Sequence, residues 1–105
     1  PVHLARLATA TARLLKMDET FAPDDFVVNR DYLGAGYGVV GDVEREAIRL
    51  AGRCEGLLVD PVYTGRALAG LIELVRRGDI GAHETVLFWH TGGLPSLFAY
   101  ADALV

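Results

Sequence analysis

The chain has 105 residues, of which 51% are hydrophobic, enough for one small domain with a single core. Its 14 acidic residues outnumber 10 scattered basic ones, so it lacks the basic patch by which proteins bind nucleic acid. No apolar run reaches the length of a membrane span, and the first residues lack a signal-peptide pattern, which favours a cytoplasmic protein.

Cysteine and histidine residues give no sign of a disulfide or a metal site. Cys54 is the single cysteine and falls on the apolar side of a predicted helix, which indicates a core residue rather than a reactive thiol. The three histidines lie far apart in sequence, with no cysteine or paired carboxylate at ligand spacing. The mean hydropathy of +0.27 predicts apolar surface that meets another domain or subunit.

The predicted elements alternate between helix and strand. Apolar residues at intervals of three and four predict a helix over about residues 3–17. A second helix is expected from Asp42 to a stop at Gly56, and a third from Thr64 or Gly65 to a stop at Gly78. Apolar runs predict strands that begin at about residue 26, at 57–59 and at 85–90, and Pro95 opens a closing helix at about 94–103.

This alternation predicts an α/β fold, a three-layer sandwich in which about three parallel strands lie between about four helices. The unbroken apolar run 57–59 is typical of a parallel strand that is covered on both faces. Three strands make a narrow sheet with exposed edges. We therefore expect residues 1–105 to form a single α/β piece of a larger domain.

Three unusual turns each follow a predicted strand: residues 34–38, 60–65 and 90–93. Ligands of open α/β sheets bind at the carboxyl ends of the strands, where such turns converge. One alternative is that these are ordinary turns rich in glycine and proline. Another is a dinucleotide-binding turn at 34–38, but its third glycine is replaced by Val39 and the helix begins too late.

The runs Gly-Tyr-Gly-Val at 36–39, Asp-Pro-Val-Tyr-Thr-Gly at 60–65 and His-Thr-Gly-Gly at 90–93 carry a family resemblance. In this order and spacing they resemble the D-cysteine desulfhydrase and 1-aminocyclopropane-1-carboxylate deaminase family, over about residues 26–100. The resemblance implies a pyridoxal 5'-phosphate enzyme of fold type II, similar to the tryptophan synthase β subunit. It also implies that this chain is the carboxy-terminal part of the large cofactor-binding domain.

The same resemblance implies roles for five residues. Thr91 and Gly92 are expected at the cofactor, where a threonine hydroxyl is a neutral partner for the pyridine nitrogen. Tyr37 and Tyr63 are expected at the reacting end, where phenols transfer protons or orient the leaving group. Thr64 completes the catalytic set. The alternatives are that Thr91 only caps a helix and that each tyrosine is a half-buried structural residue.

The position of Thr64 carries a glutamate in the deaminase branch, so threonine favours the desulfhydrase branch. The predicted activity is elimination from D-cysteine, giving pyruvate, ammonia and sulfide. The alternatives are 1-aminocyclopropane-1-carboxylate deamination and a non-catalytic docking module.

Lys16 is the single lysine, and its place on the first helix predicts a surface residue rather than the lysine that holds the cofactor. We therefore expect the chain alone to be inactive. Its expected partners are a small amino-acid substrate, the rest of the same enzyme and a second copy in a homodimer.

Overall fold

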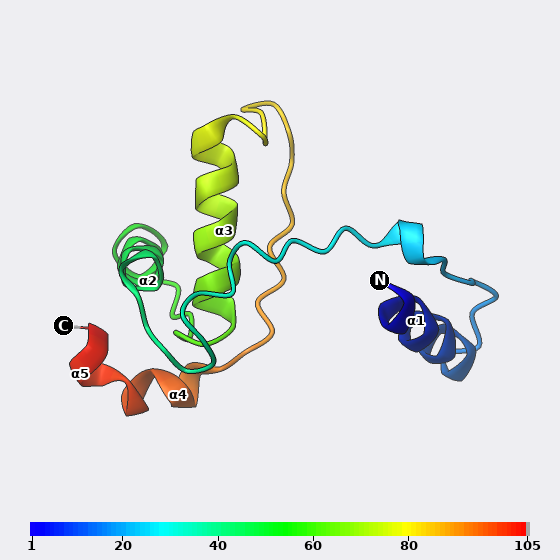
Figure 1. Cartoon of the computed structure of the whole chain (residues 1–105), viewed down its shortest axis with the longest axis horizontal. Coiled ribbons are helices and arrows are strands. Elements are labelled where there is room, and N and C mark those ends of the chain that lie inside the picture. Colours follow the sequence, from blue (N-terminus) through cyan, green and yellow to red (C-terminus); the bar gives the residue numbers. More distant parts are fainter. Residues whose placement is uncertain (105) are drawn as a thin grey trace. The chain divides into compact units, whose positions relative to one another are not determined.

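The computed structural model describes residues 1–104. The chain divides into two compact units, Pro1–Arg30 and Asp31–Val105, and each is a body by itself. The first unit consists of α1 (Val2–Leu14) and the short 3-10 helix η1 (Pro23–Asp25). The second contains α2 (Asp42–Glu55), α3 (Thr64–Arg77), α4 (Leu94–Ala99) and α5 (Ala101–Leu104) (Figure 1).

Polar contacts and a helix stop define the first unit. The hydroxyl of Thr9 on α1 accepts a hydrogen bond of 2.9 Å from the amide of Phe21. α1 ends three residues before the predicted limit, because Lys16 lies in the left-handed region with a φ of 58°. Lys16 is exposed, as the sequence predicted.

The core of the second unit lies where α2 packs against α3. The buried residues at this contact are small, which allows the two backbones to approach closely. They include Ala47 and Ala51 on α2 and Gly65 on α3, whereas Gly70 of α3 packs against the ring of Tyr32. The predicted ends of both helices are confirmed, since Gly56 and Gly78 have φ values of 65° and 78° and stop the helices in the left-handed conformation.

The predicted parallel sheet is wrong for the residues that the structure describes, because none of them is in a strand. The segments expected as strands, at about 26–28, 57–59 and 85–90, run as coil in Figure 1. A strand requires a neighbouring segment that accepts and donates its ladder hydrogen bonds, and within residues 1–104 these segments have no such neighbour. Leu87 is therefore 81% exposed and Trp89 75%.

Two smaller predictions are also corrected. Cys54 is exposed rather than buried, because it lies in the last turn of α2, whereas the buried residues of that helix, Glu44, Ala47 and Ala51, precede it. The closing helix is two short helices, α4 and α5, since Tyr100 between them has a non-helical ψ of 18°. The expected proline at the start of this segment is confirmed, because Pro95 lies in the first turn of α4.

The same substitution in α2 and α3 is expected to have opposite effects. A Cβ on Gly65 would lie 2.5 Å from the carbonyl oxygen of Asp60, so Gly65→Ala should lower the free energy of unfolding by about 2 kcal/mol. A Cβ on Gly52 would meet no atom within 4 Å, so Gly52→Ala should raise it by about 0.5 to 1 kcal/mol. Urea unfolding followed by circular dichroism measures both, and a stabilising Gly65→Ala would contradict this packing.

Candidate functional site

Two tyrosines from different segments of the second unit meet at their hydroxyl groups. The hydroxyl oxygens of Tyr37 and Tyr63 lie 3.0 Å apart and share a hydrogen bond. Their rings make an edge-to-face contact, with centroids 6.0 Å apart and planes at 68°. Tyr37 is 80% exposed and Tyr63 is 61% exposed. The two predicted site tyrosines thus form a pair whose phenols are open to a ligand.

The pairing changes the acidity of one phenol. The hydrogen bond with Tyr37 raises the pKa of Tyr63, and partial burial and the charges of Tyr37 and Asp60 raise it further. A raised pKa means that Tyr63 keeps its proton at neutral pH. Tyr63 is therefore a neutral phenol rather than a phenolate in this arrangement.

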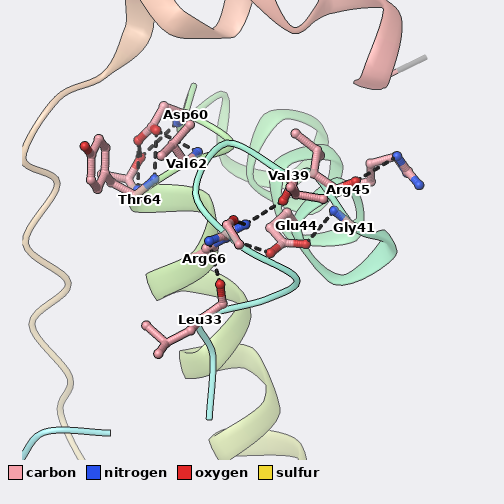
Figure 2. Close-up of polar contacts among 12 residues, drawn as sticks. Leu33, Val39, Gly41, Glu44, Arg45, Asp60, Val62, Thr64 and Arg66 are labelled. Carbon is pink, nitrogen blue, oxygen red and sulfur yellow. Dashed lines mark hydrogen bonds and ion pairs between the residues drawn. The ribbon is translucent and has the colours of Figure 1, made fainter. Parts of the chain in front are cut away.

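The loop that carries Tyr63 is organised by the buried carboxylate of Asp60. One carboxylate oxygen accepts hydrogen bonds from the amides of Val62 and Tyr63, both at 2.8 Å. The other accepts from the amide of Thr64 at 2.8 Å and from its hydroxyl at 2.7 Å. Asp60 thus holds the amides that lead into α3 and the first amide of that helix, as Figure 2 shows for Val62 and Thr64.

Opposing influences act on the Asp60 carboxyl group. Burial alone raises its pKa. The hydrogen bonds donated by the Thr64 hydroxyl and by three backbone amides outweigh burial, so the pKa of Asp60 lies below its usual value. Asp60 is therefore a stable carboxylate near neutral pH.

Thr64 is buried, with 3% of its surface exposed. Its hydroxyl donates to the Asp60 carboxylate and accepts a hydrogen bond of 2.9 Å from the Asp60 amide. Both bonds are structural, so this geometry ties Thr64 to the loop that holds Tyr63. The catalytic role expected for Thr64 stays a prediction.

The turn at Thr91 packs against the same carboxylate. Gly93 has a φ of 98°, and a Cβ added there would lie 2.6 Å from the Asp60 carboxyl group. The amide of Gly92 donates to Nδ1 of His90 at 3.1 Å, and Nε2 of His90 lies 3.0 Å from the carbonyl oxygen of Leu58. Because Nδ1 accepts, the proton of the neutral ring is on Nε2, which donates to Leu58. His90 therefore ties the turn to the segment that leads into Asp60.

Tyr37 lies in a glycine-rich turn that is held by Arg66 of α3. The guanidinium donates to the carbonyl oxygens of Leu33, Gly36 and Val39 at 2.6, 2.7 and 2.5 Å. Its Nε donates to the buried carboxylate of Glu44 at 2.9 Å. In Figure 2 Arg66 lies between the turn and the first turn of α2.

The turn that carries Tyr37 and the loop that carries Tyr63 line a pocket with a volume of about 680 Å³, which is within the usual range of small-molecule sites. Its walls are largely aromatic and apolar and include Trp89, and the predicted site residues among them are Tyr37, Tyr63, Thr64 and Thr91. Three of the five predicted site residues thus share one open pocket with exposed side chains, namely the two tyrosines and Thr91. Gly92 adjoins it in sequence.

Sequence reasoning missed Glu44, Arg66 and the role of Asp60. Asp60 precedes a predicted helix by four residues, and this spacing was the available signal. Glu44 lies at the third position of α2, where a glutamate caps the helix. Arg66 gave no signal, because its three carbonyl partners lie 27 to 33 residues earlier in the chain.

The described part of the chain contains neither a candidate membrane span nor a metal-binding cluster. No helix there combines the length and apolar character that crossing a membrane requires. No group of three or more histidine, cysteine, aspartate or glutamate side chains in that part is arranged to hold a metal ion.

Comparison with known proteins gives consistent matches. Residues 3–92 match the family model described as pyridoxal-phosphate dependent enzyme. The chain is 43% identical over 100 residues to a 1-aminocyclopropane-1-carboxylate deaminase of Burkholderia vietnamiensis (strain G4 / LMG 22486). It is 45% identical over 101 residues to that of Methylobacterium sp. (strain 4-46). The matches cover 95% and 96% of this chain, which spans about 30% of the length of either relative.

A solved structure gives the same result for the fold. The crystal structure of an ACC deaminase homologue superposes with a TM-score of 0.76 at 38% sequence identity. The match covers 97% of this chain and 30% of that one.

Proposed function

The chain belongs to the family of pyridoxal-phosphate dependent enzymes, and from that premise we propose that the whole protein opens and deaminates 1-aminocyclopropane-1-carboxylate or a similar small amino acid. The single observation that carries the proposal is the Tyr37–Tyr63 hydroxyl pair at a pocket that also contains Thr91. Because the chain spans about 30% of its relatives' length, the activity is proposed for the full-length protein.

The pocket fits the ring of the cofactor better than its phosphate. Aromatic walls and the Thr91 hydroxyl suit a flat pyridine ring whose nitrogen takes a neutral partner. Among the described lining residues Arg66 is the sole cation, and its guanidinium is engaged by Glu44 and three carbonyl groups. We propose that Thr91 and Gly92 hold the ring end and that other parts of the full-length protein hold the phosphate.

Bound pyridoxal phosphate supplies the electron sink that makes the α carbon of an amino acid reactive. The tyrosines of this chain then have a task at the other end of the substrate, because ring opening places negative charge on a carbon that must be protonated. Tyr63, whose raised pKa keeps it protonated, donates the proton. Tyr37 holds the Tyr63 hydroxyl in place through their shared hydrogen bond.

D-cysteine desulfhydration is the second candidate, and Thr64 is the observation that favours it. The sequence-based prediction placed this activity first, whereas the names of the relatives support the deaminase. The Thr64 hydroxyl is bonded to Asp60 and is not ionisable at neutral pH, so it offers no additional proton beside Tyr63. Expelling a thiol needs fewer proton transfers than opening a ring.

An assay of the full-length protein with both substrates tests the proposal. Purified protein is supplied with pyridoxal phosphate and incubated separately with 1-aminocyclopropane-1-carboxylate and with D-cysteine. Keto acid and ammonia from the cyclopropane substrate are the expected result. Keto acid and sulfide from D-cysteine alone would favour the second candidate, and the absence of keto acid in both reactions would contradict both.

A further inference from the structure

The turn that carries Tyr37 depends on a single side chain from another element. Gly34, Gly36 and Gly38 have φ values of 63°, 147° and 73°, so the turn uses a backbone that glycine adopts at the cost of conformational entropy. Its carbonyl groups have few partners inside the turn itself. Three of them converge on the guanidinium of Arg66, which therefore fixes the path of the chain around Tyr37.

Arg66 also connects the two halves of the tyrosine pair. It is the third residue of α3, and Tyr63 immediately precedes that helix. A shift of the turn relative to the start of α3 therefore changes the distance between the Tyr37 and Tyr63 hydroxyl groups. That distance is 3.0 Å, within the range of a good hydrogen bond, and a change of 1 Å would break the bond.

Glu44 fixes the direction of the guanidinium. Its side chain is 2% exposed, and one carboxylate oxygen accepts from Nε of Arg66. The other oxygen accepts a hydrogen bond of 2.9 Å from the amide of Gly41, at the start of α2. An ion pair this well buried is costly to break, so Arg66 has one orientation.

Arg66 lines the pocket, but most of its N–H groups are already bound within the protein. Its Nε, Nη1 and Nη2 atoms all donate within the protein, and Nη2 donates to two carbonyl groups. A guanidinium has five N–H groups, and four of those of Arg66 donate hydrogen bonds to groups of the same chain. Its contribution to the site is therefore geometric.

We propose that Arg66 and Glu44 are positioning residues that hold the Tyr37 turn against the start of α3 and so set the bond between the Tyr37 and Tyr63 hydroxyl groups. This inference rests on the proposed function for its effect on turnover. Its structural part, the control of the tyrosine pair, has its own readout.

The test uses Arg66→Lys in the full-length protein with pyridoxal phosphate bound. Lysine keeps the charge beside Glu44 but is a point donor that does not span three carbonyl groups. We expect kcat for the active substrate to fall about 10- to 100-fold while KM changes less than about threefold. Tyr37→Phe should cost a similar factor, about 10- to 100-fold, in the wild-type background and less than about threefold in the Arg66→Lys background.

A matched control comes from the other ion pair between the same two helices. Arg76 of α3 and Glu46 of α2 lie 2.6 Å apart, both are more than half exposed, and neither touches the turn. Arg76→Met also removes one ion pair between α2 and α3. If Arg66 mattered only because it joins these two helices, Arg76→Met should have a similar effect. We expect Arg76→Met instead to leave kcat within about twofold of the wild type.

The second readout is the alkaline titration of Tyr63, followed by the ultraviolet absorbance of tyrosinate. The signal of Tyr63 is the difference between each protein and its Tyr63→Phe version. Because the hydrogen bond shared with Tyr37 raises the pKa of Tyr63, Arg66→Lys should lower this pKa, and Arg76→Met should not. Glu44→Gln, which removes the ion pair but keeps the guanidinium, replaces Arg66→Lys in both readouts if that variant does not fold.

The outcomes separate the two proposals. No keto acid from the wild-type protein contradicts the proposed function, and the titration then decides the inference. An unchanged Tyr63 titration in the Arg66 variant overturns the inference whatever the activity. Equal costs of Tyr37→Phe in the two backgrounds overturn it as well, since Arg66 would then act independently of Tyr37.

Discussion

Tyr63→Phe in the full-length protein is expected to lower kcat for the active substrate by about 100- to 10,000-fold, with little change in KM. The reason is that Tyr63 is the proposed proton donor, and phenylalanine keeps the ring contact while it removes the hydroxyl group. Steady-state kinetics with the substrate identified in the two-substrate assay measures the effect. A fall of less than about fivefold would contradict the role of Tyr63 as proton donor.

The pH dependence provides the control for this prediction. A phenol has an ordinary pKa of about 10, and that of Tyr63 is raised, so the activity that depends on its proton should persist above pH ~10 as far as the protein remains folded. In Tyr37→Phe the shared hydrogen bond is lost, and the decline should move to lower pH. Identical alkaline limbs in the wild type and in Tyr37→Phe would show that Tyr63 is not the group that titrates.

The helices of the second unit were predictable because their signals are local. Gly56 and Gly78 end α2 and α3 through their own backbone conformation, which needs no distant partner. The extended segments were a different case. The run of apolar residues at 57–59 predicted a strand covered on both faces, which is wrong: Val59 is 1% exposed, but Leu57 and Leu58 are each 51% exposed. A strand forms only when a second segment pairs with it, and the sequence of one segment does not show whether such a partner is present among the described residues.

The candidate site divides in the same way. Tyr37, Tyr63 and Thr91 were predicted as site residues because their side chains lie in turns of unusual sequence, and the structure brings the two phenols into contact. The groups that hold these turns were missed. Arg66 acts on backbone carbonyl groups, which carry no residue identity, so the chain gives no sequence pattern from which such a contact follows.

Asp60→Ala is expected to lower the free energy of unfolding by about 3 kcal/mol at pH 7. The substitution removes the acceptor of three amide groups at the start of α3 and of the Thr64 hydroxyl, and the site is closed to water because Asp60 is 0% exposed. Urea unfolding followed by circular dichroism measures the change. Asp42→Ala at the start of α2 is the matched control, since its exposed carboxylate makes only a surface ion pair, and it should cost about 0.5 kcal/mol.

Acid pH should reduce the difference between the wild type and Asp60→Ala. The pKa of Asp60 is lower in the folded protein than in the unfolded chain, where it is about 3.9. The stabilisation by its charge is therefore fully present above pH ~4 and is lost as the pH falls through the folded pKa. Urea unfolding at a series of pH values from about 6 to 2 measures this. A difference that stays constant over the whole range would show that the charge of Asp60 does not contribute, and that its hydrogen bonds act equally well when it is protonated.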